Sequence, residues 1–294
     1  MQGLPILRST PQLRSRIRSW RAFGETVAVV AVGRALHEGH LGLIRAARGE
    51  ADRVLAVVAR WCDDGTDGRP GPGDDEDAFD EIEAAEQVEE AGADAVYLPS
   101  AESLFPAASV VDIQLRGLTD VLCGEDRPDR FDGFALTFTR LLSQAQADVL
   151  VFGERDWQRL TILRRLAKDL DLPTEVRSAP TERDMDGVAW AEGAQDLTGE
   201  DRAAAIRLWR ELTRAAAAID GGADVDASLD AAADALADVG AEVEYLDLRD
   251  AETLEEVGAP SADRPARIFA AIELGGLRLI DNVPLGAKRN PLDG

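Results

Sequence analysis

The stretch VAVVAVGRALHEGHLGLIRAA, residues 27–47, joins an apolar run to a pattern typical of a helix. Residues 27–32 are all valine or alanine, a composition expected of a central strand that is buried on both faces of a parallel sheet. The run is followed by His37 and His40, the only 2 histidines of the chain. We therefore expect a strand, a turn and a helix, with both histidines where the helix begins.

Comparable apolar runs recur along the first part of the chain, at residues 53–60, 94–99, 147–153 and 174–180. Helical patterns alternate with them, at residues 40–51, 80–92, 135–146 and 156–170. Alternation of buried strands with helices of this length is typical of an α/β domain with a doubly wound parallel sheet. The sequence therefore predicts a Rossmann-like domain over residues 1–185.

The pattern changes in the last third of the chain, which we assign to a smaller α+β domain over residues 186–294. A long helical pattern covers residues 197–219, where Thr198 and Asp201 are spaced as a variant of the capping box. A second helix is expected at 226–239, and strands are expected within the stretches 243–250 and 267–283.

Charge and composition exclude several classes of partner. The chain has 56 acidic against 32 basic residues and a net charge of −24, so its surface repels nucleic acid and anionic membranes. No run of apolar residues is long enough to span a bilayer. Cys62 and Cys123 form neither a disulfide framework nor a zinc-binding spacing. A cytoplasmic protein that binds neither nucleic acid nor membrane is expected.

The N-terminal segment is rich in arginine and poor in acidic residues, which is also a property of organelle transit peptides. The alternative is an ordinary helix capped by Ser9 or Thr10, with Pro11 in its first turn. The capping pattern favours the helix.

The two histidines suit a nucleotide site. Ligands bind at the carboxyl ends of the strands in an open α/β sheet, and a helix N-terminus attracts phosphate. Gly39 has no Cβ and would let a nucleotide approach the backbone closely. Side chains three residues apart on a helix share one face, so His37 and His40 could both donate to one phosphate. Such donors would stabilise the charge that develops when a carboxylate attacks the α-phosphate.

Two other interpretations of the histidines remain. They could face solvent on the first helical turn, or they could bind a metal ion. The spacing of HEGH differs from the HExxH pattern of zinc proteases, in which the two ligands are four residues apart. The position of the motif after the first buried strand favours nucleotide binding.

The sequence resembles the pantoate–beta-alanine ligase (pantothenate synthetase) family of the HxGH nucleotidyltransferase superfamily. The matching stretches keep the family's order and spacing and include ALHEGHLGLIRAAR (35–48), RPDRFDG (127–133), VFGERDWQ (151–158) and LRLIDNVPL (277–285). The resemblance implies a homodimer that uses ATP with Mg²⁺. It also implies that an acid and an amine are joined through an acyl-adenylate.

The resemblance also suggests roles for individual residues. It implies that His37, His40 and Arg155 are catalytic, although the family has a lysine where Arg155 stands. It implies that Gly39, Gly153 and Asp156 contact the nucleotide; Asp156 could also serve as a helix N-cap.

The sequence departs from the family where the acid and the triphosphate bind. An Asn-Pro-Leu-Gln-Phe stretch of the family is replaced by residues 60–64, which begin with Arg60 and include Asp63. A glutamine of the family is replaced by Arg159, while Gln158 is kept. A Ser-Ser-Arg-Asn segment that closes over the phosphates is replaced by residues 191–194, Ala-Glu-Gly-Ala.

These departures leave several hypotheses open. The first is an active ligase with an altered acid pocket formed by Arg60, Asp63, Gln158 and Arg159, in which the two arginines would suit a second carboxylate. The second is synthesis of pantothenate itself. The third is a catalytically degenerate relative that binds nucleotide or acts as a dimeric non-enzyme. The least favoured hypothesis is a general nucleotidyltransferase. Arg60 and Arg159 could also be surface residues paired with the abundant acids.

Overall fold

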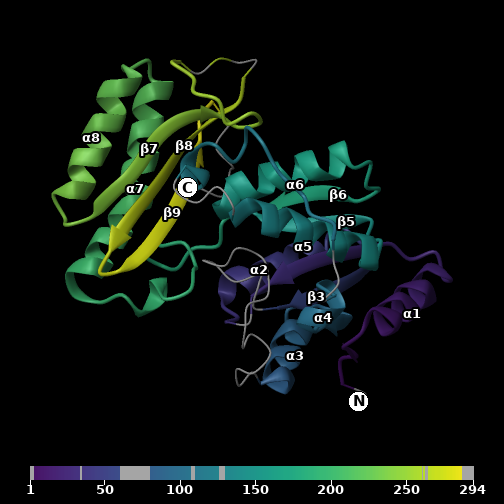
Figure 1. Ribbon diagram of the computed structural model, residues 1–294. Coiled ribbons are helices and arrows are strands. Elements are labelled where there is room, and N and C mark those ends of the chain that lie inside the picture. The colour runs from purple at the N-terminus through teal and green to yellow at the C-terminus, as the bar shows by residue number, and fades with distance from the viewer. Residues whose placement is uncertain are drawn as a thin grey trace. The chain divides into compact units, whose positions relative to one another are not determined.

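We analysed a computed structural model of the chain, which describes residues 3–33, 35–59, 80–106, 110–125, 130–259, 261 and 264–286. Figure 1 shows its helices and strands. Six parallel strands form the larger sheet, in the order β1-β4-β3-β2-β5-β6. The strands are β1 (Ile6–Leu7), β2 (Val27–Val32), β3 (Arg53–Val58), β4 (Ala95–Tyr97), β5 (Val149–Gly153) and β6 (Glu175–Ala179).

Helices connect these strands. They are α1 (Thr10–Arg21), α2 (Glu38–Ala47), α3 (Glu81–Glu90), α4 (Ala101–Leu104), α5 (Arg130–Ala145) and α6 (Trp157–Asp169). Short 3₁₀ helices occur at Leu122–Gly124 (η2) and Glu154–Asp156 (η3). The predicted doubly wound parallel sheet is confirmed.

Strand β2 lies at the centre of the sheet, as its composition predicts. All six of its residues are buried, and the strand pairs with β3 on one side and β5 on the other. Ala28, Val30 and Val32 pack in one cluster with residues of α2 and α3, while the alternate residues face the opposite side of the sheet and are also buried. The apolar run is therefore covered on both faces.

The N-terminal helix is capped as predicted. Ser9 is the N-cap of α1, and its Oγ accepts a hydrogen bond from the backbone N–H of Gln12 at 3.5 Å. Pro11 stands in the first turn, where a missing N–H costs nothing. Leu13, Ile17 and Trp20 form the buried face of the helix.

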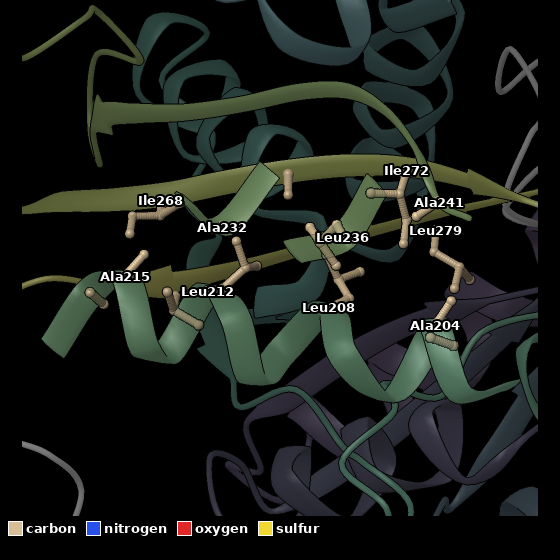
Figure 2. Packing of buried hydrophobic residues seen from close by; sticks show 14 of the residues in the cluster. Ala204, Leu208, Leu212, Ala215, Ala232, Leu236, Ala241, Ile268, Ile272 and Leu279 are labelled. Atoms are coloured by element: carbon tan, nitrogen blue, oxygen red, sulfur yellow. The ribbon is translucent and has the colours of Figure 1, made fainter. Parts of the chain in front are cut away.

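The second sheet is antiparallel, with strand order β7-β8-β9. Its strands are β7 (Glu242–Asp250), β8 (Ala266–Leu274) and β9 (Leu277–Pro284), and its helices are α7 (Gly199–Asp220) and α8 (Val225–Ala237). Both helices pack on the sheet and on each other (Figure 1). In Figure 2, Leu208 and Leu212 of α7 point toward the strands that carry Ile268, Ile272 and Leu279. This apolar interface is the core of the predicted α+β domain.

The capping prediction for α7 is only partly correct. Thr198 is the N-cap residue, but its side chain makes no capping hydrogen bond with the helix. The spacing of Thr198 and Asp201 therefore located the helix start without producing the reciprocal bonds of a capping box.

The chain divides into two compact units. The N-terminal unit contains residues 1–120, 124–154 and 162–180, and the C-terminal unit contains residues 121–123, 155–161 and 181–294. The main division lies close to the boundary predicted at residue 185, which stays a prediction. Within the described residues, no helix has both the length and the apolar character needed to cross a membrane.

Gly187 is a position where only glycine fits. Its φ is +92°, and a Cβ added there would lie 2.8 Å from the indole of Trp209. The guanidinium of Arg183 covers that indole with its Cζ 4.9 Å from the ring centroid, so the ring has little room to move. We expect Gly187→Ala to lower the free energy of unfolding by about 2 kcal/mol, from backbone strain and overpacking together.

Urea unfolding checks this prediction. Gly258→Ala is the matched control, because Gly258 is not in the positive-φ region and a Cβ there would meet nothing within 4 Å. An equal loss for both variants would contradict the argument.

Candidate functional site

The HEGH turn lies at the point where the order of strands reverses. The chain continues from β2 to β3 on one side, whereas β5, which comes later in the chain, pairs with the other side of β2. The carboxyl ends of β2 and β5 are therefore neighbours, and in open α/β sheets this is where ligands bind. Helix α2 begins at Glu38, six residues after Val32 ends β2.

The two histidines lie side by side on the first turn of α2. His37 is the N-cap residue, with φ −142° and ψ 171°, and its carbonyl accepts hydrogen bonds from the backbone N–H of His40 at 2.9 Å and of Leu41 at 3.1 Å. The imidazole rings stack with centroids 3.9 Å apart and an angle of 14° between their planes. Both residues are half-buried. The prediction that His37 and His40 share one helix face is confirmed.

The surroundings of the pair are suited to an anion. The first N–H groups of a helix have no helical carbonyl four residues earlier to bond to, and the helix dipole favours negative charge there. Glu38 adds one acidic group to that turn, but its carboxylate pairs with Arg45 at 2.5 Å. Gly39 stands between the two histidines in the sequence, is half-buried and has no Cβ.

Gly153 ends β5 beside the same helix. A Cβ placed on Gly153 would lie 3.5 Å from Leu43 of α2, which is ordinary van der Waals contact. The structure therefore brings Gly153 to the helix that carries His37, Gly39 and His40. These four predicted residues belong to the N-terminal unit.

The predicted residues that follow Gly153 are held by the C-terminal unit. The Arg155 guanidinium donates to the carbonyl of Trp190 at 3.0 Å through Nη1, and to Asp156 Oδ2 at 3.0 Å through Nη2. The side chains of Arg155 and Asp156 are 13% and 18% exposed. Arg155 also lines a small cavity, together with Ala191 and Asp281.

Gln158 is buried, and its side-chain amide forms hydrogen bonds with backbone groups. Its Oε1 accepts from the N–H of Cys123 at 3.2 Å, and its Nε2 donates to the carbonyl of Val121 at 2.8 Å. The Cys123 thiol lies 3.2 Å from the Tyr245 hydroxyl, and burial together with that thiol raises the pKa of the phenol. Gln158 therefore fixes a short segment that is packed against β7.

Of the other predicted acid-binding residues, the structure describes Arg159. Arg159 is half-buried on the first turns of α6. Arg60 and Asp63 lie outside the described residues. In the segment that departs from the family, Glu192 is exposed, whereas Ala194 is fully buried in the core of the C-terminal unit.

The residues that hold Arg155 in place were not predicted from the sequence. Asn282 of β9 is 5% exposed, and its Nδ2 donates to the carbonyl of Arg155 at 2.9 Å. Its Oδ1 accepts from Arg267 Nε at 2.7 Å, and the Arg267 Cζ lies 3.7 Å from the ring centroid of Trp157. The indole N–H of Trp157 in turn donates to the carbonyl of Ala251 at 2.7 Å. The available signal was the polar pair Asp-Asn inside the apolar sequence of β9.

Comparisons with known proteins give a consistent result. The family described as "Pantoate-beta-alanine ligase" matches residues 5–284. A pantothenate synthetase of Paracoccus denitrificans is 40% identical over 285 residues, covering 95% of this chain and 97% of the relative. A pantothenate synthetase of Rhodospirillum rubrum is 40% identical over 286 residues, covering 96% of this chain and 99% of the relative.

Solved structures agree with the fold. The crystal structure of pantothenate synthetase from Thermus thermophilus is 31% identical with a TM-score of 0.83, and covers 95% of this chain and 99% of that one. A pantoate–beta-alanine ligase from Francisella tularensis, crystallised with beta-gamma ATP and beta-alanine, is 23% identical with a TM-score of 0.73 over 96% of this chain and 98% of that one. The second likeness bears on the fold alone.

Proposed function

The chain belongs to the pantoate–beta-alanine ligase family, and we propose that it forms an amide from a small carboxylic acid and an amine such as beta-alanine, with cleavage of ATP. The observation that carries this proposal is the stacked pair of His37 and His40 on the first turn of α2. Donor groups placed at a helix N-terminus favour the negative charge of a bound phosphate.

The proposed reaction has two steps. The carboxylate of the acid attacks the α-phosphorus of ATP, a P–O bond breaks, and pyrophosphate leaves with the electron pair. The amine then attacks the acyl carbon, loses a proton and expels AMP. His37 and His40 would stabilise the charge on the α-phosphate in the first step. On the family resemblance, Arg155 would contact the phosphates, while Asp156 and the backbone at Gly39 and Gly153 would contact the nucleotide.

Mg²⁺ fits this proposal as part of the ATP substrate. The candidate phosphate-binding side chains are imidazole and guanidinium groups, whereas Mg²⁺ prefers oxygen ligands and is commonly held by substrate phosphates. We infer that Mg²⁺ binds together with ATP, held by the phosphate oxygens, and neutralises part of their negative charge. We further propose that the protein is cytoplasmic, as its composition suggests, and a homodimer, as the family resemblance implies. Sedimentation of the purified protein tests the dimer.

The acid is proposed to differ from pantoate. Arg159 replaces a neutral glutamine of the family, and Arg60 and Asp63 change the same pocket on the sequence resemblance. A second carboxylate on the acid would suit the added guanidinium groups. Gln158 would act on this pocket through the backbone it holds.

Pyrophosphate release tests both the reaction and the acid. We expect release that depends on ATP, acid and amine together, with a dicarboxylic acid giving a kcat/KM about tenfold above that of pantoate because a bidentate arginine contact is gained. Pantoate as the best acid would contradict the altered pocket while keeping the ligase. An absence of release with every acid and amine would contradict the ligase itself.

A second candidate is a nucleotide-binding protein without turnover. The observation that favours it is the segment 191–194. Glu192 is exposed and acidic, and Ala194 is apolar and buried in the core, so neither side chain offers positive charge to a phosphate. Calorimetry separates the candidates, because binding of ATP without pyrophosphate release would support this one.

A further inference from the structure

The start of α6 is held by side chains from distant parts of the C-terminal unit. The helix-start segment, residues 155–158, carries three of the predicted site residues. Asn282 donates a hydrogen bond to the carbonyl of Arg155. The indole of Trp157 lies under the guanidinium of Arg267 and donates to the carbonyl of Ala251. The side chain of Gln158 forms hydrogen bonds with the backbone of residues 121–123. Strands β8 and β9 therefore contribute directly to the placement of this segment.

Asn282 is the connecting residue of this arrangement. It is 5% exposed, and its side chain uses both ends, donating to Arg155 and accepting from Arg267. An amide is suited to this place because it offers a donor and an acceptor at once, whereas a carboxylate only accepts and an aliphatic side chain does neither. Its neighbour Val283 packs instead in the apolar core with α7 and α8. Core packing therefore does not explain the amide at residue 282.

Arg155 is consequently fixed at both of its ends. Its carbonyl is held by Asn282, and its guanidinium reaches the carbonyl of Trp190 and the carboxylate of Asp156. Between these contacts the side chain lines the cavity that also includes Asp281. A shift of the carbonyl would move the base of the side chain and redirect its N–H groups.

We propose that Asn282 is a positioning residue, which acts on catalysis by fixing the backbone of Arg155 and thereby aiming its guanidinium. The inference rests on the proposed function, in which Arg155 contacts the ATP phosphates. Arg267 and Trp157 help to fix the Asn282 side chain, because the Arg267 guanidinium stacks on the Trp157 indole and donates its Nε–H to the Asn282 oxygen.

Asn282→Asp is the sharpest variant. It removes the donor to the Arg155 carbonyl but keeps an acceptor for Arg267, so the side chain stays close in size and paired. We expect the kcat for pyrophosphate release to fall about tenfold, because a displaced catalytic group loses rate even when binding persists. The KM for the amine should stay within about twofold of wild type.

A double-mutant cycle separates positioning from stability. In an Arg155→Ala background we expect Asn282→Asp to change kcat by less than about twofold, since the group it aims is gone. Val283→Ala is the matched control on the same strand; it should weaken folding and leave kcat within about twofold of wild type. Additive effects of Asn282→Asp and Arg155→Ala would overturn the inference.

A spectroscopic measurement keeps the inference distinct from the proposed function. The side-chain Nε–Hε resonance of Arg155 can be assigned by its loss in Arg155→Ala. We expect this resonance to shift in Asn282→Asp and to keep its position in Val283→Ala. If the wild-type protein releases no pyrophosphate, the ligase proposal fails while this shift still supports positioning. An unmoved resonance in Asn282→Asp overturns the inference whether or not the enzyme is active.

Discussion

His40→Ala is expected to slow ATP-dependent pyrophosphate release by about two to three orders of magnitude, and His37→Ala by a similar factor. Each variant removes one donor from the place where charge develops on the α-phosphate, and loss of one such donor costs about 3 kcal/mol in other enzymes. The two rings stack with their centroids 3.9 Å apart, and in the proposed function both donate to the same phosphate. Single-turnover kinetics at saturating ATP measure the chemical step.

The double variant should lose little more than either single variant, because residues that act on one group are not additive. Arg45→Ala is the control on the same helix; it breaks an ion pair in which the Arg45 and Glu38 side chains are 49% and 50% exposed, and should leave the rate within about twofold. Thermal melts establish that α2 still forms. Rates near wild type in both folded histidine variants would contradict the proposed role of the pair.

The fold could be predicted from the sequence because its central strand is unambiguous. Residues 27–32 form β2 as predicted, since a run of valine and alanine has few stable alternatives to a buried strand. The edge strand β1, Ile6–Leu7, was not predicted because two residues are too few for any periodicity to be recognised. Helix α2 begins at Glu38, where the histidine-bearing turn predicts its start, and His37 serves as the N-cap.

The candidate site could be predicted only where its residues are close in sequence. The spacing of His37 and His40 fixes their common face, since helix geometry alone places residues three apart together. The contact of Asn282 with Arg155 joins residues 127 positions apart. Such a contact depends on how β9 packs in the C-terminal unit, and no local pattern encodes it.

Loss of one partner from the buried ion pair between Arg183 and Asp281 of β9 should strongly destabilise the C-terminal unit. Asp281 binds Arg183 through two hydrogen bonds, of 2.6 and 2.8 Å, and the two side chains are only 3% and 16% exposed. The Arg183 guanidinium also donates to the carbonyl of Gly187 and stacks on Trp209. Removing one partner of such a pair leaves the other charge buried without compensation, which is more costly than losing the attraction itself.

We therefore expect Asp281→Ala to lower the free energy of unfolding by about 3 to 5 kcal/mol, measured by urea unfolding. Replacing both partners, as Arg183→Met with Asp281→Leu, should recover most of that loss because no uncompensated charge remains. Asp169→Ala, which breaks an ion pair with Arg165 whose side chains are 62% and 49% exposed, should cost less than about 1 kcal/mol. If Asp281→Ala costs no more than Asp169→Ala, desolvation of the pair does not govern this unit's stability.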